Sequence, residues 1–214
     1  MKKRSIKLKD YINKDYKFDK STMLGIFCLI IVITGVCGWL YEVIFYFFNS
    51  GMTTIYWRGG NFLPWINIYA IGAILVYLLT YKKRKNPLYV FLVSILATGI
   101  LEYIGGWFME YILKVKCWDY NSETLSFGSI NGYVCLRSVL VFGFFSLILI
   151  YVIIPLCFNI ARKMKKKNFL ILSYTLCAIF LFDEIYNLIF AKMLSLPRSS
   201  DVYKELGFKY LYFK

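Results

Sequence analysis

Six ionisable side chains lie inside strongly apolar stretches of this sequence, where a lipid bilayer is the expected surrounding. They are Glu42, Glu102, Glu110, Arg137, Asp183 and Glu184. An ionised group at the centre of a bilayer costs about 2.5–3.5 kcal/mol on insertion scales, so it is rarely kept without a partner or a function. Crowded carboxylates share protons and attract cations. These residues therefore predict a polar membrane site for a proton or a cation.

A purely structural role for the same residues stays open. Arg137 can pair with one or two of the carboxylates and lock the helices together. Five acids and one base are more than a single ion pair needs. The remaining carboxylates would then have to be protonated, hydrated or bound to something cationic.

The composition excludes several classes of function. Hydrophobic residues make up 59% of the 214 and aromatic residues 20%, and the mean hydropathy is +0.58. Histidine is absent, which excludes His-based zinc sites and Ser-His-Asp triads. The net charge of +14 comes from Lys and Arg in short segments beside apolar blocks, a pattern typical of membrane topology signals and not of nucleic-acid binding. The sequence predicts neither a bound metal nor a cofactor.

Five apolar blocks are long enough for transmembrane helices of about 20 residues. They cover approximately residues 23–48, 62–81, 88–113, 132–155 and 169–193. The first block is too long for the core of a signal peptide, so we interpret it as a retained signal anchor. The predicted fold is all-α, a polytopic transmembrane helical bundle with five spans within residues 21–193.

The distribution of Lys and Arg predicts the orientation of these spans. These residues number 8 in the first twenty positions, 4 in residues 82–85 and 5 in residues 162–167, against 1 and 2 in the other two loops. The positive-inside rule therefore predicts a cytoplasmic N-terminus and a multi-pass protein of the cytoplasmic membrane. Residues 1–20 form a basic cytoplasmic segment, either an amphipathic interfacial helix or an unstructured tail. Residues 194–214 form a tail that is external with five spans.

This orientation places all six ionisable residues in the outer half of the bilayer. The third span carries small and polar residues at every fourth position, namely Ser94, Thr98, Glu102, Gly106 and Glu110. Such a stripe faces a partner helix or a water-filled cavity in preference to lipid. The external loop adds four candidates, which are Trp118, Asp119, Tyr120 and Asn131. Cys117 and Cys135 lie in or beside the same loop, and whether they form a disulfide stays open.

The motifs around these residues resemble a bacterial family labelled putative ABC-transporter permease, type IV. The resemblance covers about residues 38–155 and rests on Gly-Trp-Leu-Tyr-Glu at 38–42, Glu-x7-Glu at 102–110, Trp-Asp-Tyr at 118–120 and Asn-Gly at 131–132 leading to Arg137. The sequence departs from the family pattern at Gly60-Asn61, at Pro64-Trp65-Ile66-Asn67 and at Ile154-Pro155. The resemblance implies transport.

Three functions from different classes follow from these observations. The first is a membrane component of a transporter with an acidic polar site in the outer half of the bilayer. The second is a non-catalytic interaction or regulatory membrane protein. The third is a membrane-embedded enzyme acting on a lipid or envelope precursor, in which Glu102 pairs with Asp183 or Glu184 and Arg137 binds the anionic group. The last is the least favoured, because the sequence shows no nucleophile motif.

The expected partner is the lipid bilayer, and nucleic acid is not expected. The sequence has no GxxxxGK[ST] phosphate loop, so ATP-driven transport would require a separate cytoplasmic ATPase. Another membrane subunit or a second copy of the chain stays open as a partner.

Overall fold

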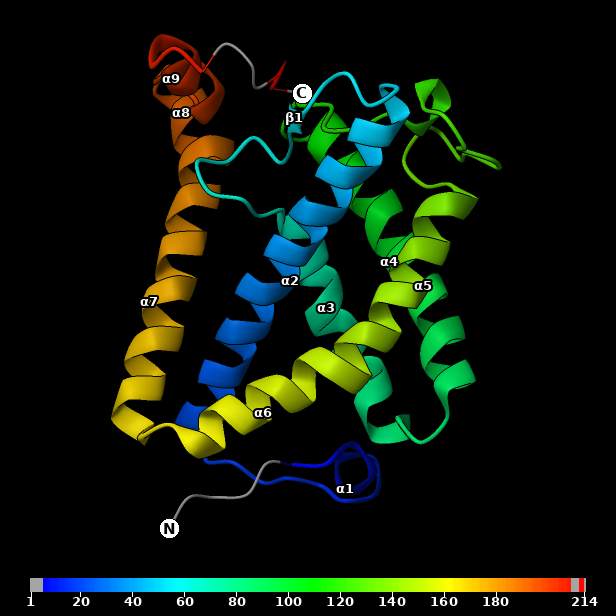
Figure 1. The fold of residues 1–214 in the computed structure, drawn as a ribbon. Helices are drawn as coiled ribbons and strands as arrows, with labels where there is room; N and C mark the ends of the chain where they lie inside the picture. Colours follow the sequence, from blue (N-terminus) through cyan, green and yellow to red (C-terminus); the bar gives the residue numbers. More distant parts are fainter. Residues whose placement is uncertain (1–5, 209–211, 214) are drawn as a thin grey trace. The chain divides into compact units, whose positions relative to one another are not determined.

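The computed structural model describes residues 6–208, 212 and 213, and in these residues the structure is dominated by helices (Figure 1). The chain divides into two compact units. The first comprises Met1–Lys17 and Ile71–Lys163, and the second comprises Phe18–Ala70 and Met164–Lys214. Parts of the predicted N-terminal segment (residues 1–5) and of the predicted C-terminal tail (residues 209–211 and 214) lie outside the described residues.

Two long helices that run in the same direction form the second unit. They are α2 (Lys20–Asn49) and α7 (Lys166–Ile185), which continues into the π-helix η4 (Tyr186–Phe190). Two short helices, α8 (Ala191–Met193) and α9 (Ser199–Glu205), follow. Strand β1 (Tyr56–Trp57) pairs in parallel with β2 (Tyr212–Phe213).

Small residues on α2 allow this close parallel packing. A Cβ on Gly25 would lie 2.8 Å from Ser173 Oγ, and a Cβ on Gly35 would lie 2.9 Å from the Phe180 ring. The contacts advance along both helices together, so α2 and α7 start at the same end (Figure 1).

A polar contact joins the starts of these two helices. The side chain of Asp19 caps α2 by accepting a hydrogen bond from the backbone N–H of Thr22, and it accepts another from Lys166 Nζ at 2.8 Å. The Lys166 ammonium, together with the hydroxyl donors, lowers the pKa of Asp19 well below its usual range.

The first unit is built on an antiparallel helix pair. Its elements are α1 (Leu8–Asn13), the 3-10 helix η1 (Tyr81–Lys83), α4 (Pro87–Tyr111), the 3-10 helix η2 (Tyr120–Ser122), α5 (Leu136–Ile148), the π-helix η3 (Leu149–Ile153) and α6 (Ile154–Lys163). A Cβ on Gly143 would meet Phe91, and one on Gly99 would meet Val139, so α4 and α5 run in opposite directions (Figure 1). Helix α3 (Asn67–Thr80) begins in the second unit and ends in the first.

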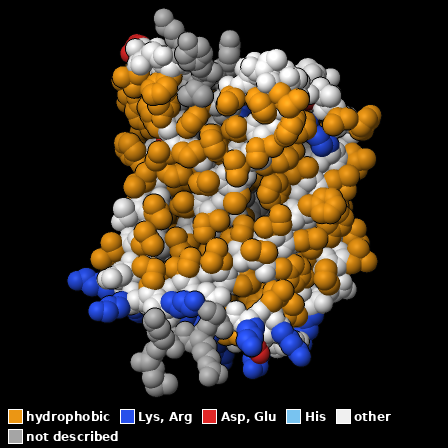
Figure 2. Space-filling view, in the orientation of Figure 1, with side chains coloured by type: hydrophobic (Ala, Val, Ile, Leu, Met, Phe, Trp, Pro, Cys, Tyr) orange, Lys and Arg blue, Asp and Glu red, His pale blue; other side chains and the backbone are white. Residues whose placement is uncertain are grey.

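Helix α4 has its polar face inside and its apolar face outside. Its buried residues are Val90, Ser94, Thr98, Glu102 and Gly106. Its exposed residues include Leu92, Leu96, Ile100 and Ile104. Hydrophobic side chains likewise cover much of the visible helix surface (Figure 2). A helix that exposes leucine and buries serine suits a lipid surrounding, where apolar exposure has no cost.

Four stretches of helix are long and apolar enough to cross a membrane. They are Lys20–Asn49, Pro87–Tyr111, Leu136–Lys163 and Lys166–Phe190. The predicted second span corresponds to α3, which has 14 residues and a length of about 21 Å at 1.5 Å per residue. A hydrocarbon core is about 30 Å thick. Four helical spans are therefore found, and the fifth crossing and the cytoplasmic N-terminus remain predictions.

The helix that contains the predicted fourth span, approximately residues 132–155, extends beyond Pro155. The helix continues to Lys163 through the π-helix η3, which lies directly before Pro155. Proline has no N–H to donate to the carbonyl four residues earlier, and a π-turn can redistribute the freed backbone groups without ending the helix.

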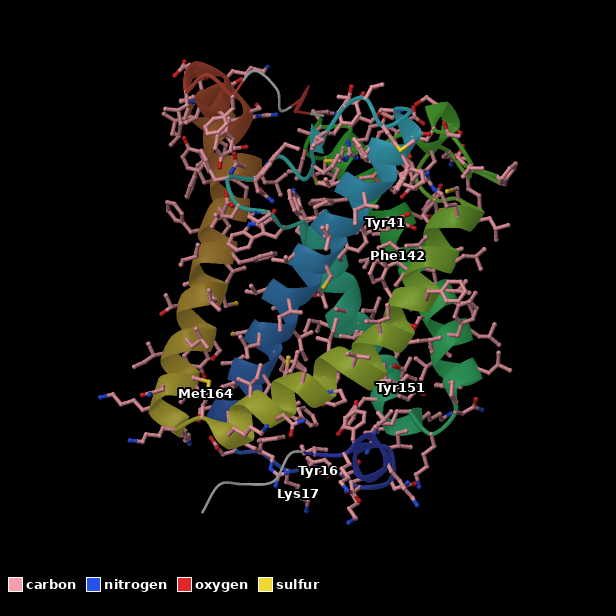
Figure 3. The ribbon with its side chains drawn as sticks, viewed as in Figure 1. Tyr16, Lys17, Tyr41, Phe142, Tyr151 and Met164 are labelled. Carbon is pink, nitrogen blue, oxygen red and sulfur yellow. The ribbon has the colours of Figure 1, made fainter. Side chains whose placement is uncertain are left out.

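The basic N-terminal segment folds against the first unit. Arg84, which is buried, donates to the carbonyls of Tyr11 and Lys14 and to the Asp15 carboxylate. Tyr151 donates its hydroxyl to the Arg84 carbonyl, and Tyr16 lies at the same end of this unit (Figure 3). The apolar side of the predicted amphipathic helix is thus partly used inside the protein, since Tyr11 is fully buried.

Candidate polar membrane sites

The six ionisable residues singled out in the sequence divide equally between the two units. Glu102, Glu110 and Arg137 belong to the first unit, and Glu42, Asp183 and Glu184 belong to the second. A single site shared by all six remains a prediction.

Within each helix, the acids lie far from the basic end. At 1.5 Å per residue, Asp183 is about 26 Å along α7 from Lys166, and Glu42 is about 33 Å along α2 from Lys20. Glu102 is about 23 Å along α4 from Pro87, which follows the Lys-rich turn. The depth of these acids in the bilayer remains a prediction.

Asp183 holds the chain segment that precedes α3. Its carboxylate accepts hydrogen bonds from the backbone N–H groups of Phe62 and Leu63, both at 2.9 Å. It also accepts one from Asn187 Nδ2 at 2.8 Å. The side chain is only 4% exposed. A buried carboxylate thus satisfies two successive backbone donors that a non-helical segment would otherwise leave open.

Glu184, the next residue, binds side chains of the same segment. Its two oxygens accept from Asn61 Nδ2 at 2.8 Å and from Asn67 Nδ2 at 2.9 Å. Asn61 Nδ2 also donates to the Trp65 carbonyl at 3.2 Å. Asp183 and Glu184 together therefore hold residues 61–67, where a non-helical segment leads into helix α3.

The C-terminal helix α9 contributes the remaining contacts to this segment. Ser199 Oγ donates to the Gly60 carbonyl, and Tyr203 donates its hydroxyl to the Phe62 carbonyl. Ser199 N–H in turn donates to Asn187 Oδ1, which links α9 to the Asp183 cluster. Non-helical backbone at membrane depth is tolerated only when its polar groups are satisfied in this way.

Glu42 has an ion-pair partner that sequence analysis did not assign. Arg58 Nε donates to its carboxylate at 2.8 Å, and the Tyr69 hydroxyl lies 3.3 Å from the other oxygen. The Arg58 guanidinium lies 4.0 Å from the centre of the Tyr46 ring. Arg58 looked like an ordinary loop charge, because nothing in the sequence shows that the chain after α2 turns back along that helix.

Glu102 is met by hydroxyl groups. Tyr120 donates its hydroxyl to one carboxylate oxygen and Ser138 Oγ donates to the other, both at 2.7 Å. The residue is 3% exposed. Ser138 lies in the first turn of α5, and its Oγ also accepts from the Cys135 N–H. One buried carboxylate thus joins α4, α5 and the loop between them.

The Trp-Asp-Tyr motif organises that loop. Trp118 Nε1 donates to the Tyr133 carbonyl at 2.9 Å, and Asp119 caps η2 by accepting from the Asn121 N–H. Asp119 also pairs with Lys116, and this bond lowers the pKa of the Asp119 carboxyl. Gly132 has a φ of +79°, and any Cβ there would collide with the Asp119 carboxylate.

The other predicted residues of the first unit also contact this loop. Arg137 pairs with Glu123 at 2.7 Å and donates to the Thr124 carbonyl, so its ion pair is with a loop acid that the sequence analysis did not select. Glu110 accepts from the Tyr133 hydroxyl at 2.7 Å. Asn131 Nδ2 donates to the Tyr103 hydroxyl at 2.9 Å. Arg137 and Glu123 also make contacts other than their ion pair with each other.

The chemistry available to these clusters is hydrogen bonding and charge compensation. Among the described residues, no group of three or more Cys, Asp, Glu or His is placed to hold a metal ion. Cys117 is exposed and Cys135 is buried, and they do not form the disulfide that the sequence left open.

Comparison with known proteins gives one match. No curated protein and no solved structure matches the chain. Residues 29–188 match a family described as "Putative ABC-transporter type IV". The matched range includes all six ionisable residues and all four loop candidates. The match spans most of the chain, and it agrees with the resemblance carried by the sequence motifs and with the apolar helices. The protein is therefore a membrane protein that belongs to the ABC-transporter type IV family.

Proposed function

We propose that this chain is the membrane subunit of a transporter, with an acidic polar site in the outer half of the bilayer. One observation carries the proposal. Each of the six ionisable residues contacts one of two loops, residues 50–66 or residues 114–135. Each loop follows a helix, α2 or α4, whose other end adjoins a basic segment. The partners are Arg58, Tyr120, Tyr133, Glu123, Phe62 with Leu63, and Asn61.

The same contacts suggest how such a site would work. A loop bound by a carboxylate is held less strongly when that carboxylate gains a proton or binds a cation, because hydrogen bonds to an ionised acceptor are about twice as strong as those to a neutral one. Loop release would open the helix ends to the outside. Protonation of these acids, or binding of a cationic cargo to them, would therefore trigger the release of the loops.

The second crossing of the membrane supports a pathway role. In this proposal residues 58–66 cross part of the bilayer as a non-helical segment and α3 crosses the rest. Discontinuous spans of this kind are typical of transport pathways, because unwound backbone offers polar groups in the middle of the membrane. Asp183 and Glu184 bind that unwound part.

An ATPase partner follows from the family and from the absence of a phosphate loop in this sequence. Purification in mild detergent from the native host tests this directly. We expect an ATP-hydrolysing subunit in the eluate, with phosphate release lowered by Glu102→Gln or Glu42→Gln. Glu205→Gln is the matched control, since Glu205 is exposed on α9 and outside both clusters. An eluate without ATPase, or equal activity in all variants, would contradict the proposal.

A second candidate is a non-catalytic protein that regulates or assembles with a partner. The observation in its favour is that the oxygens of Asp183 and Glu184 already accept hydrogen bonds from the protein itself. In that case the Glu-to-Gln variants would change complex stability while ATP turnover stays the same. We propose no catalytic reaction for this chain.

A further inference from the structure

Residues 124–130, the apolar finger, form the part of the external loop that the function above does not use. The finger reads Thr-Leu-Ser-Phe-Gly-Ser-Ile, and no charged residue occurs from Thr124 to Leu136. Leu125, Phe127 and Ile130 are 54%, 67% and 56% exposed. A loop in water normally exposes polar side chains, so three exposed large apolar residues in seven positions indicate an apolar partner.

The base of the finger is held in place. Arg137 Nη1 donates to the Thr124 carbonyl at 3.0 Å, and Ser126 Oγ donates to the Glu123 carbonyl at 2.6 Å. Leu125 has a φ of +61°, a conformation that leucine rarely adopts. The structure therefore maintains an unfavourable backbone conformation while an apolar side chain points outward.

The finger continues the lipid-facing surface of α5. Exposed residues recur along that helix at every fourth position, namely Leu136, Leu140, Phe144, Ile148 and Val152. The Leu136 N–H donates to the Phe127 carbonyl at 2.9 Å, which puts Phe127 directly beyond the first residue of this row. Since the row faces acyl chains in a membrane, Phe127 extends the same apolar surface by one more position.

The depth of the finger agrees with this placement. Asn131, the residue after the finger, donates to the Tyr103 hydroxyl. Tyr103 is about 24 Å along α4 from Pro87, within the thickness of a hydrocarbon core of about 30 Å. Trp107 and Tyr111, which stack on each other one and two turns further along α4, are exposed aromatic residues of the kind found at membrane interfaces.

We infer that the finger inserts Leu125, Phe127 and Ile130 into the leaflet on its own side of the bilayer, which is the outer one with five crossings, and contacts acyl chains, although the sequence places it in a polar loop. The inference is independent of transport. The finger would also connect the leaflet with the polar cluster of the first unit, because the ion pair between Arg137 and Glu123 lies at its base.

Spin labels on introduced cysteines test this in vesicles of phosphatidylcholine and phosphatidylglycerol, with the unsubstituted background as the blank for the remaining native cysteines. In a Cys117→Ser background, labels are placed by Phe127→Cys and, as the matched control, by Ser122→Cys, an exposed polar position in the same loop. We expect the Phe127 label to collide with oxygen several-fold more often, relative to a water-soluble nickel complex, than the Ser122 label does. Leu125→Cys and Ile130→Cys carry the same expectation if the first variant folds poorly.

Two results would overturn the inference. A Phe127 label that the nickel complex reaches as easily as the Ser122 label would place the finger in water. A label protected from both oxygen and nickel would show that a protein surface covers it, either a second copy of the chain or another subunit.

Discussion

The buried acids of this protein are compensated mostly by neutral donors. Glu102 accepts from two hydroxyls, Asp183 from two backbone N–H groups and an amide, and Glu184 from two amides. Glu42, which is half-buried, pairs with Arg58. Hydrogen bonds to a carboxylate contribute about 1.5–3 kcal/mol each, so several donors can replace a counter-ion.

Tyr120→Phe tests this compensation at Glu102. The change removes one of two hydroxyl donors and keeps the ring that lies 5.5 Å from the Arg137 guanidinium. We expect a loss of about 1–2 kcal/mol in unfolding free energy, with faster hydrogen exchange in residues 114–135. Thermal unfolding in detergent and exchange mass spectrometry measure the two effects. Tyr89→Phe, whose ring lies beside Lys83, should change neither.

Gly38→Ala tests the close packing that brings Tyr69 to Glu42. A Cβ at Gly38 would overlap the Tyr69 ring, whereas a Cβ at Gly72 would have its nearest neighbour, Phe142, at 3.5 Å. Overpacking costs about 1–3 kcal/mol, which outweighs the gain of about 1 kcal/mol for alanine in a helix. Melting temperatures should therefore fall for Gly38→Ala and stay or rise for Gly72→Ala. The reverse order would show that Tyr69 can move aside at no cost.

At the scale of elements, two loops, residues 50–66 and 114–135, are held by side chains of the helices. The helices carry their polar residues inward, as α4 does, and the loops bind those residues at one end. The segment before α3 is the clearest case, since α7 supplies acceptors to its N–H groups and α9 supplies donors to its carbonyls. A loop without its own secondary structure thus becomes ordered through its neighbours.

Asp183→Asn and Glu184→Gln should differ in their effects on this segment. Asparagine at 183 places an NH2 group against a backbone N–H of Phe62 or Leu63, which cannot turn away, so we expect a loss of about 1–3 kcal/mol. Glutamine at 184 faces Asn67, whose amide can rotate to accept, so the loss should stay below about 1 kcal/mol. Melting temperature and proteolysis of residues 50–66 measure the difference. Equal effects would mean that the backbone bonds to Asp183 contribute little.

At the scale of the whole molecule, the number of membrane crossings, four or five, decides the topology. Four helices are long enough to span, and α3 is about 21 Å long. If residues 58–66 and α3 cross together, the loop at 82–85 is cytoplasmic and α9 is external. If they do not cross, both positions are reversed, and α7 would have to cross in the direction opposite to α2, which disagrees with their parallel packing.

Cysteine labelling in spheroplasts distinguishes the two topologies. In a Cys117→Ser background, five crossings predict that a membrane-impermeant maleimide labels Ser122→Cys and Glu205→Cys in intact spheroplasts. Lys85→Cys should then react only after permeabilisation. Four crossings predict the opposite pattern at all three positions, so a single set of variants decides between them.

Much of the fold follows from the sequence because apolar length is a local signal. The predicted block at 23–48 corresponds to α2 (Lys20–Asn49), and that at 88–113 corresponds to α4 (Pro87–Tyr111). The buried face of α4 coincides with the predicted stripe of Ser94, Thr98, Glu102 and Gly106. The sequence did not show that α3 begins only at Asn67 or that the helix of the fourth span continues past Pro155, because a non-helical segment and a π-helix leave no periodic pattern.

The sequence by itself determined the membrane class, the family, four of the helices and the residues that needed a partner, since each depends on hydropathy or on neighbours a few positions apart. Only the tertiary structure decided which residues bind the acids. Asp183 bonds to Phe62 across 121 positions, Glu184 to Asn61 across 123, and Arg58 to Glu42 after the chain turns back. Asn61 and Asn67 moreover stand where the sequence departs from the family pattern. Hydrogen bonding needs atoms within about 3 Å of each other, and only the folded chain brings such distant residues that close.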